Sequence, residues 1–120
     1  MNLLLVDDEA PLLQLLGQHL VRSGHVIEPA GNVREALAAI AKAPIGAYDF
    51  GLIDWSLPDG TGLEVAAELL KRDSKARVIF TSGYPLEDEL FPASMRGRVR
   101  VLQKPFMPRA LGELMAAWKS

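Results

Sequence analysis

The chain has 120 residues, of which 49% are hydrophobic and 23% charged, and its formal net charge is −2 at pH 7. This length fits a single domain, residues 1–120, and the small charge gives no reason to expect direct nucleic-acid binding. No apolar run has the length of a membrane span or the layout of a signal peptide, and the absence of cysteine excludes disulfides and fits a reducing, cytoplasmic location.

The first strand-like and helix-like runs come directly after one another. Residues 2–6 (NLLLV) are continuously apolar, which is typical of a strand buried on both faces. The acids of 7–9 follow, and Pro11 suits the first turn of a helix. Leucines then recur at helical spacing across 12–20, and Gly24 is a good helix stop.

The same alternation is repeated from residue 25 onward. A shorter strand is expected at 25–30. Asn32 and Glu35 have the spacing of a capping box, which predicts the start of a second helix. That helix has to end before Pro44.

The third strand is expected at 50–54 and ends abruptly on a carboxylate, Asp54. A Pro-Asp-Gly turn follows at 58–60, and Thr61 with Glu64 predicts a second capping box. A buried strand has no use for an acid at its tip, so Asp54 is a candidate reactive or metal-binding group. Taken alone, the residue type favours a turn-initiating aspartate that accepts backbone hydrogen bonds, because such residues are common in turns.

The remaining elements include the weakest part of the pattern. A fourth strand is expected at 77–81, and 84–97 is expected to hold one or two helical turns that Pro92 cuts short. A last strand at 99–103 leads to a helix that begins at Pro108. The basic residues in this part are interpreted as a solvated strand edge, and they are Arg96, Arg98, Arg100 and Lys104.

Strict alternation of strands and helices predicts an α/β fold with a parallel sheet and helices on both faces. Ligands of such sheets bind outside the carboxyl ends of the strands. Four of the five expected strands deliver polar residues to that edge, and these are Asp7, Asp8, Asp54, Ser82 and Lys104. This coincidence favours a functional site over unrelated turn and capping residues.

The residue types predict the chemistry of that site. Three neighbouring carboxylates repel one another, and a hard cation with oxygen ligands, of which Mg²⁺ fits best, removes the conflict. Lys104 supplies a point charge for a phosphate oxygen, and Ser82 supplies a hydroxyl donor. These are the parts needed for phosphoryl transfer to a carboxylate.

Four motifs give the chain a family resemblance over essentially its full length. They are VDDE at 6–9, LIDWSLPDGTGLE at 52–64, FTSGYP at 80–85 and LQKPF at 102–106. Together they resemble the response-regulator receiver domain of two-component signalling. The resemblance implies a flavodoxin-like (βα)5 three-layer sandwich with strand order 2-1-3-4-5.

The resemblance also implies a role for each site residue. Asp54 would accept a phosphoryl group from a phosphohistidine on a sensor histidine kinase or a histidine phosphotransfer protein. Mg²⁺ would be bound by Asp8, by Asp54 and by the backbone carbonyl of Ser56, with Asp7 acting through a bound water. Lys104 would hold a phosphoryl oxygen and Ser82 would sense the product, while Pro105 is expected to follow a cis peptide bond.

The chain departs from the family pattern in two places. The position three residues before the lysine, usually Tyr or Phe, is Val101. Activation is therefore expected to work through the loop after Ser82, with little rearrangement at Val101. Pro92 shortens the fourth helix, which puts dimerisation through that face in doubt.

Two rival functions remain open at this point. A small aspartyl-phosphate phosphatase of the haloacid dehalogenase type needs a second Asp two residues after the nucleophile, where this chain has Ser56. A non-phosphorylated interaction module on the same fold would need a degraded site, whereas this site is complete. The downstream output is not indicated, because no segment after the last expected helix could carry it.

Overall fold

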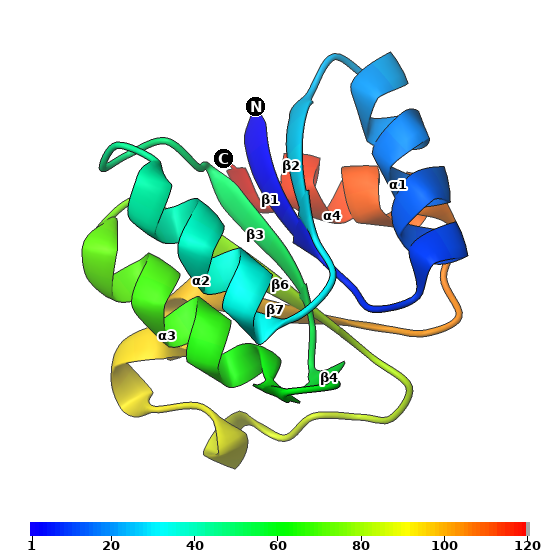
Figure 1. The fold of residues 1–120 in the computed structure, drawn as a ribbon. Coiled ribbons are helices and arrows are strands. Elements are labelled where there is room, and N and C mark those ends of the chain that lie inside the picture. The colour runs from blue at the N-terminus through cyan, green and yellow to red at the C-terminus, as the bar shows by residue number, and fades with distance from the viewer. Residues whose placement is uncertain (120) are drawn as a thin grey trace.

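The structure, a computed structural model, describes residues 1–119 (Figure 1). Two short segments, η1 and η2, are 3-10 helices. The elements in chain order are β1 (Asn2–Val6), α1 (Ala10–Arg22), β2 (Val26–Ala30), α2 (Val33–Lys42), β3 (Phe50–Asp54), β4 (Ser56–Leu57), β5 (Gly60–Thr61), α3 (Gly62–Arg72), β6 (Arg77–Ser82), η1 (Asp88–Leu90), η2 (Ala93–Arg98), β7 (Val99–Gln103) and α4 (Pro108–Lys119).

Five strands form one parallel sheet in the order β2-β1-β3-β6-β7. The short strands β4 and β5 form a separate antiparallel hairpin after β3, where the sequence predicts only a turn. With that hairpin set aside, the predicted α/β fold and strand order are confirmed. The carboxyl ends of the five strands meet at one edge of the sheet, toward the bottom of Figure 1.

Alternate residues of each strand face opposite helical layers. In β1, Leu3 and Leu5 pack in the cluster that includes α1 and α4, whereas Leu4 and Val6 pack in the cluster that includes α2 and α3. Figure 1 shows the same division of the four helices about the sheet. Fully burying each such leucine or valine stabilises the fold by roughly 1.5–3 kcal/mol, so the all-apolar strands account for the two-sided core.

The N-cap predicted at the start of α2 is confirmed, and the Glu35 side chain bonds back to Gly31, the residue before that cap. Asn32 Oδ1 accepts a hydrogen bond from Glu35 N at 2.8 Å. In return, Glu35 Oε1 accepts one from Gly31 N at 2.8 Å. Two amide groups at the helix start are thereby satisfied by side chains.

The capping box predicted for α3 is wrong. Thr61 is the N-cap residue, but its side chain makes no capping hydrogen bond. The helix start is fixed instead by Gly62, whose N donates to Trp55 O at 2.8 Å. A Cβ atom at this glycine would lie 2.3 Å from the carbonyl oxygen of Asp54, so only glycine permits this approach.

The segment between β6 and β7 contains 3-10 turns in place of an α-helix. The sequence predicted one or two helical turns beginning at Pro85 and lined by Leu86, Leu90 and Phe91. Of these, Leu90 is 46% exposed, whereas Phe91 is buried. Proline at position 92 has no N–H to donate, and η2 begins immediately after it.

The interpretation of the basic residues as a solvated strand edge is wrong for Arg98. Its guanidinium donates to the backbone carbonyls of Leu70 at 3.0 Å and Ala76 at 2.8 Å, and also to that of Asp73. These carbonyls lie at or just beyond the end of α3. The guanidinium therefore closes a helix terminus, which the spacing of charges along the sequence could not indicate.

Within residues 1–119, none of the helices combines the length and the apolar character needed to cross a lipid bilayer.

Candidate functional site

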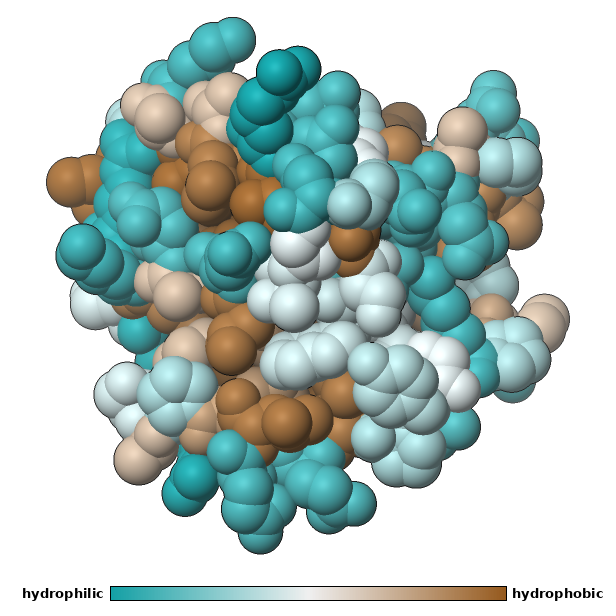
Figure 2. Space-filling model, turned by 60° about the horizontal axis from the view of Figure 1, so that its bottom comes forward, coloured by the Kyte–Doolittle hydropathy of each residue, from teal (hydrophilic) through white to brown (hydrophobic). Residues whose placement is uncertain are grey.

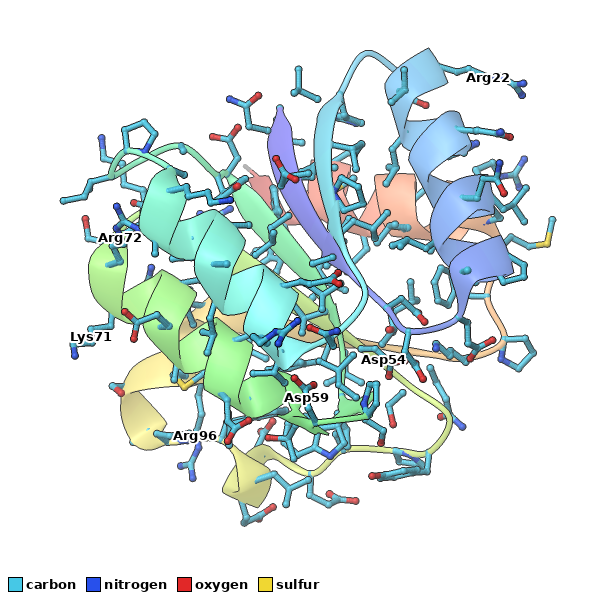
Figure 3. The ribbon with its side chains drawn as sticks, viewed as in Figure 1. Arg22, Asp54, Asp59, Lys71, Arg72 and Arg96 are labelled. Atoms are coloured by element: carbon cyan, nitrogen blue, oxygen red, sulfur yellow. The ribbon has the colours of Figure 1, made fainter. Side chains whose placement is uncertain are left out.

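Polar side chains from three strand ends and the loop after β7 converge at the carboxyl edge of the sheet. Lys104 Nζ lies 3.1 Å from Asp7 Oδ2 and 3.0 Å from Asp54 Oδ2. Both aspartates are buried, and the lysine side chain is 17% exposed. Figure 3 shows Asp54 at the tip of β3, facing this edge. The structure thus brings together three residues that are separated by as many as 97 positions in sequence.

Backbone hydrogen bonds between strand ends hold these residues in place. Asp7 N donates to Ala30 O at 3.1 Å, and Lys104 N donates to Ser82 O at 2.7 Å. The peptide bond between Lys104 and Pro105 is cis, as the family resemblance implies. Each polar residue is therefore positioned by the sheet itself, which gives the site a rigid support.

Burial and ion pairing shift the pKa values of Asp7 and Lys104 in opposite directions. Burial raises the pKa of Asp7, although the Glu9 backbone amide and Lys104 lower it. Burial lowers the pKa of Lys104, but its hydrogen bonds to Asp54 and Asp7 more than offset that and raise the pKa well above its usual range. The ammonium group is consequently charged throughout the neutral pH range.

The cluster also contains a third acid, Glu9, which was not among the predicted site residues. Glu9 Oε1 lies 3.4 Å from Lys104 Nζ, and carboxylate oxygens of Asp7, Glu9 and Asp54 lie within 4.8 Å of one another. The predicted ligand Asp8 is exposed and lies outside this group. The available signal was the run of three acids, because residues two apart in an extended chain point to the same side.

These residues fit a hard divalent cation. The cluster offers only carboxylate oxygens, and its negative charge is balanced here by a single lysine. Oxygen ligands and excess negative charge are what Mg²⁺ requires of a protein. The donor set therefore fits the predicted ion at the level of chemistry.

The predicted sensor hydroxyl is buried and points toward its own loop. Ser82 is 2% exposed, its Oγ donates to Tyr84 O at 2.7 Å, and it accepts from Tyr84 N at 3.1 Å. Tyr84 itself is 51% exposed. The hydroxyl lies at the sheet edge as predicted, but both of its hydrogen-bond partners belong to Tyr84 in the loop after β6.

The loop after Asp54 is tied to both the nucleophile candidate and α2. Ser56 N donates to Asp54 Oδ1 at 3.2 Å, which orients the carboxylate. Asp59 Oδ1 accepts from Val33 N at 2.8 Å, and its Oδ2 accepts from Arg34 N at 3.0 Å. These bonds lower the pKa of Asp59, with the one from Val33 contributing most. Figure 3 shows Asp59 at the start of α2.

A shallow apolar recess lies beside the lysine. A cavity of about 410 Å³ is lined by Glu9, Leu12, Lys104, Pro105 and Phe106. Figure 2 turns this edge of the molecule forward and shows apolar and weakly polar residues across much of its centre, with hydrophilic residues around them. The site therefore opens onto a surface that mixes apolar and polar residues.

Comparisons with known proteins agree with this geometry. The family model of the response regulator receiver domain matches residues 3–116. The photosynthetic apparatus regulatory protein RegA of Cereibacter sphaeroides is 36% identical over 104 residues, and the phosphate regulon regulator PhoB of Pseudomonas aeruginosa is 34% identical over 114. These alignments cover 87% and 92% of this chain but 55% and 48% of the relatives, so the chain spans about half their length.

Solved structures show the same fold. A CheY-like receiver domain from Methanospirillum hungatei is 29% identical with a TM-score of 0.83, and the match covers 97% of this chain and 90% of that one. The Thermotoga maritima protein TrrA, solved with Mg²⁺ and beryllofluoride, is 28% identical with a TM-score of 0.77, covering 98% and 97%. The chain belongs to the response regulator receiver domain family, whose members are phosphoacceptor switches of two-component signalling.

Proposed function

We propose that Asp54 is the phosphoacceptor of this receiver domain. The observation that carries the proposal is the position of Lys104, whose ammonium group bridges Asp7 and Asp54 at 3.1 and 3.0 Å. A cation held between two buried acids already occupies the region where the oxygens of a transferred phosphoryl group would need positive charge.

The proposed donor is a phosphohistidine on a sensor histidine kinase or a histidine phosphotransfer protein. An Asp54 carboxylate oxygen attacks the phosphorus, an O–P bond forms, and the electron pair of the broken N–P bond stays on the histidine nitrogen. Ser56 N holds the other carboxylate oxygen in place. Lys104 then pairs with a phosphoryl oxygen, which requires it to loosen its contact with Asp54.

The proposed metal is Mg²⁺, held by Asp8, Asp54 and the Ser56 backbone carbonyl, with Asp7 acting through water. When bound, the ion neutralises charge on the phosphoryl oxygens and the acids. Glu9 joins this proposal because its carboxylate lies within the same cluster. Asp8 lies between Asp7 and Glu9 with an exposed side chain, so its proposed role requires that side chain to turn toward the cluster.

The proposed partner surface surrounds the recess beside Lys104. Leu12 and Phe106 line the recess. Leu15, three residues after Leu12 on α1, is 57% exposed, and Met107, next to Phe106, is 72% exposed. Exposed apolar side chains beside a reactive site favour a docked protein over a small donor alone. A cytoplasmic location is part of the proposal, in keeping with the absence of cysteine.

The two rival functions lack a supporting observation in the structure. A turnover phosphatase needs a general acid two residues after the nucleophile, and Ser56 offers only a hydroxyl there. A non-phosphorylated interaction module would not need a buried acid–lysine cluster, which is costly to desolvate. We therefore propose a switch that assists its own phosphorylation without being a turnover enzyme.

The proposal is tested by incubating the protein with acetyl phosphate and Mg²⁺ and measuring its intact mass. The wild type should gain one phosphoryl group and Asp54→Asn should gain none. Asp59→Asn is the matched control, because this exposed aspartate caps α2 and should leave the gain intact. Multiple turnover of acetyl phosphate would support the phosphatase instead. No mass gain in the wild type would support the non-phosphorylated interaction module.

A further inference from the structure

The position that usually carries an aromatic switch residue has no ring in this chain. Val101 of β7 pairs with Phe80 of β6 and packs against the core cluster on that side of the sheet. A valine side chain has no large planar group that could swing between an inward and an outward position. A signal from the site to the segment 84–98 therefore needs another route than a ring movement at position 101.

Three aromatic rings connect the site to that segment. The Trp55 ring lies 5.2 Å from that of Phe80 and 5.8 Å from that of Phe91, both edge-on, and the rings of Phe80 and Phe91 are stacked at 5.4 Å. We call these three residues the aromatic triangle. Its corners come from the residue after Asp54, from β6 and from the segment 84–98, so it spans the parts that need to communicate.

The tryptophan corner is fastened to the strand ends that carry the site. Trp55 follows Asp54 directly, its N donates to Thr81 O at 2.9 Å, and its carbonyl accepts from Gly62 N at 2.8 Å. Thr81 immediately precedes Ser82. A shift at Asp54 or Ser82 therefore moves the base of the tryptophan side chain.

The phenylalanine corner is one of the two buried hydrophobic side chains of the segment 84–98, the other being Met95 at 6% exposure. Residues 83–90 are exposed apart from the half-buried Leu86, and the first buried side chain after them is Phe91, at 3% exposure. Arg96 donates to the carbonyls of Asp88 at 3.2 Å and Phe91 at 3.1 Å, which ties η1 and η2 together around that ring. Figure 3 shows Arg96 on this segment. Few buried contacts make the segment a low-stability unit.

We propose that the aromatic triangle carries the phosphorylation state of Asp54 to the segment 84–98, in place of an aromatic residue at position 101. This rests on the proposed function. To reach a phosphoryl oxygen, the Ser82 hydroxyl has to leave the Tyr84 carbonyl it now donates to. The start of the segment is then released, and the position of the rest depends on Phe91, which stacks on Phe80 and meets Trp55 edge-on.

The proposal is tested by amide hydrogen exchange across 84–98, with and without Mg²⁺ and beryllofluoride. In the wild type, the phosphoryl mimic should change exchange in this segment by about five-fold or more, the lower end of ordinary allosteric coupling. Phe91→Leu keeps an apolar side chain but removes the ring. It should exchange fast in both states and lose the difference, while still gaining a phosphoryl group from acetyl phosphate.

Phe50→Leu is the matched control. Phe50 is also 3% exposed and also meets a tryptophan edge-on, Trp118 at 5.7 Å, but on the opposite face of the sheet. This variant should keep the wild-type difference across 84–98. The relay is overturned if Phe91→Leu keeps the full difference, or if Phe50→Leu loses it equally.

A second variant guards against misfolding of Phe91→Leu. Trp55→Leu removes the other end of the relay and should also lose the difference across 84–98 while keeping the mass gain. The outcomes separate the two proposals. Phosphorylation of the wild type without a change across 84–98 overturns the relay alone, whereas no mass gain in the wild type overturns the proposed function together with the relay.

Discussion

Two connections leave the carboxyl edge of the sheet beside the site, and they are built in opposite ways. Residues 55–61, between β3 and α3, form a hairpin that is bonded to α2 through Asp59 and closed by Gly62 against the Asp54 carbonyl. Residues 83–98, between β6 and β7, are mostly exposed and hold only 3-10 turns. The nucleophile candidate therefore sits beside the rigid connection and the sensor hydroxyl beside the loose one.

This difference follows from what each connection has to do. A nucleophile benefits from fixed geometry, because small misplacements slow in-line transfer. A segment that reports a chemical change has to have two arrangements that differ little in free energy. Rigid and mobile functions are thus divided between the two sides of one sheet edge.

Gly62→Ala should distort the rigid connection at residues 55–61, and we expect the largest loss of stability from this change. The new Cβ atom would lie 2.3 Å from the Asp54 carbonyl and 2.8 Å from Ile53 Cγ2, and a backbone carbonyl in a buried strand cannot move aside cheaply. The free energy of unfolding should fall by about 3 kcal/mol, measured by urea denaturation. Gly112→Ala, in α4, has open space around the new atom and should be neutral or stabilising. A neutral Gly62→Ala would show that the connection is less rigid than described.

Arg98→Met tests whether Arg98 anchors the segment 83–98 to the end of α3. The change removes the guanidinium from the Leu70 and Ala76 carbonyls and should lower the free energy of unfolding by about 2 kcal/mol. Arg109→Met is the control, because that side chain is 87% exposed and its ion pair with Glu113 is worth little. Equal losses in both variants would contradict an anchoring role for Arg98.

Asp59→Asn tests the bond between the rigid connection and α2, because the stability that Asp59 contributes should depend on pH. Because hydrogen bonds from Val33 and Arg34 lower the folded pKa of Asp59 below its ordinary value of 3.8, the ionised group stabilises the fold above that value. The stabilisation is lost as the pH falls through the folded pKa. Thermal unfolding should show the variant less stable than wild type at pH 7, with the gap narrowing under acid conditions. A gap that does not change with pH would exclude the charge as its cause.

The sequence predicted the sheet well because its strands are short, apolar and bounded by clear turn signals. It also placed Asp7, Asp54, Ser82 and Lys104 at one edge, since parallel strands leave no other place for residues that follow them. The run of acids at 7–9 was a signal for Glu9, but the approach of its carboxylate to Lys104 depends on how the chain turns after β1, which the sequence does not show. The hydrogen bonds between Ser82 and Tyr84 could not be predicted from the sequence either, because they depend on the conformation of the loop after β6.

The segment 84–97 was the hardest to predict for a physical reason. Its prolines, glycine and apolar residues fit several short conformations, and tertiary contacts decide among them. Phe91 is buried because the space between Trp55 and Phe80 accepts a ring. Sequence spacing gave Leu90 and Phe91 the same inward role, and only the packed core separates them.

The two arginines that cap helix ends have a consequence for the order in which the helices of this face are completed during synthesis. Arg72 of α3 donates to the carbonyls of Ile40 and Ala43 at the end of α2, just as Arg98 of η2 donates to those at the end of α3. Each helix on this face is therefore completed by a residue about 25 to 30 positions further along. Until residue 98 has been synthesised, the carbonyls at the end of α3 have only water or other groups as partners in place of Arg98. A nascent chain halted before that point would hold all of α3 but not the side chain that finishes it.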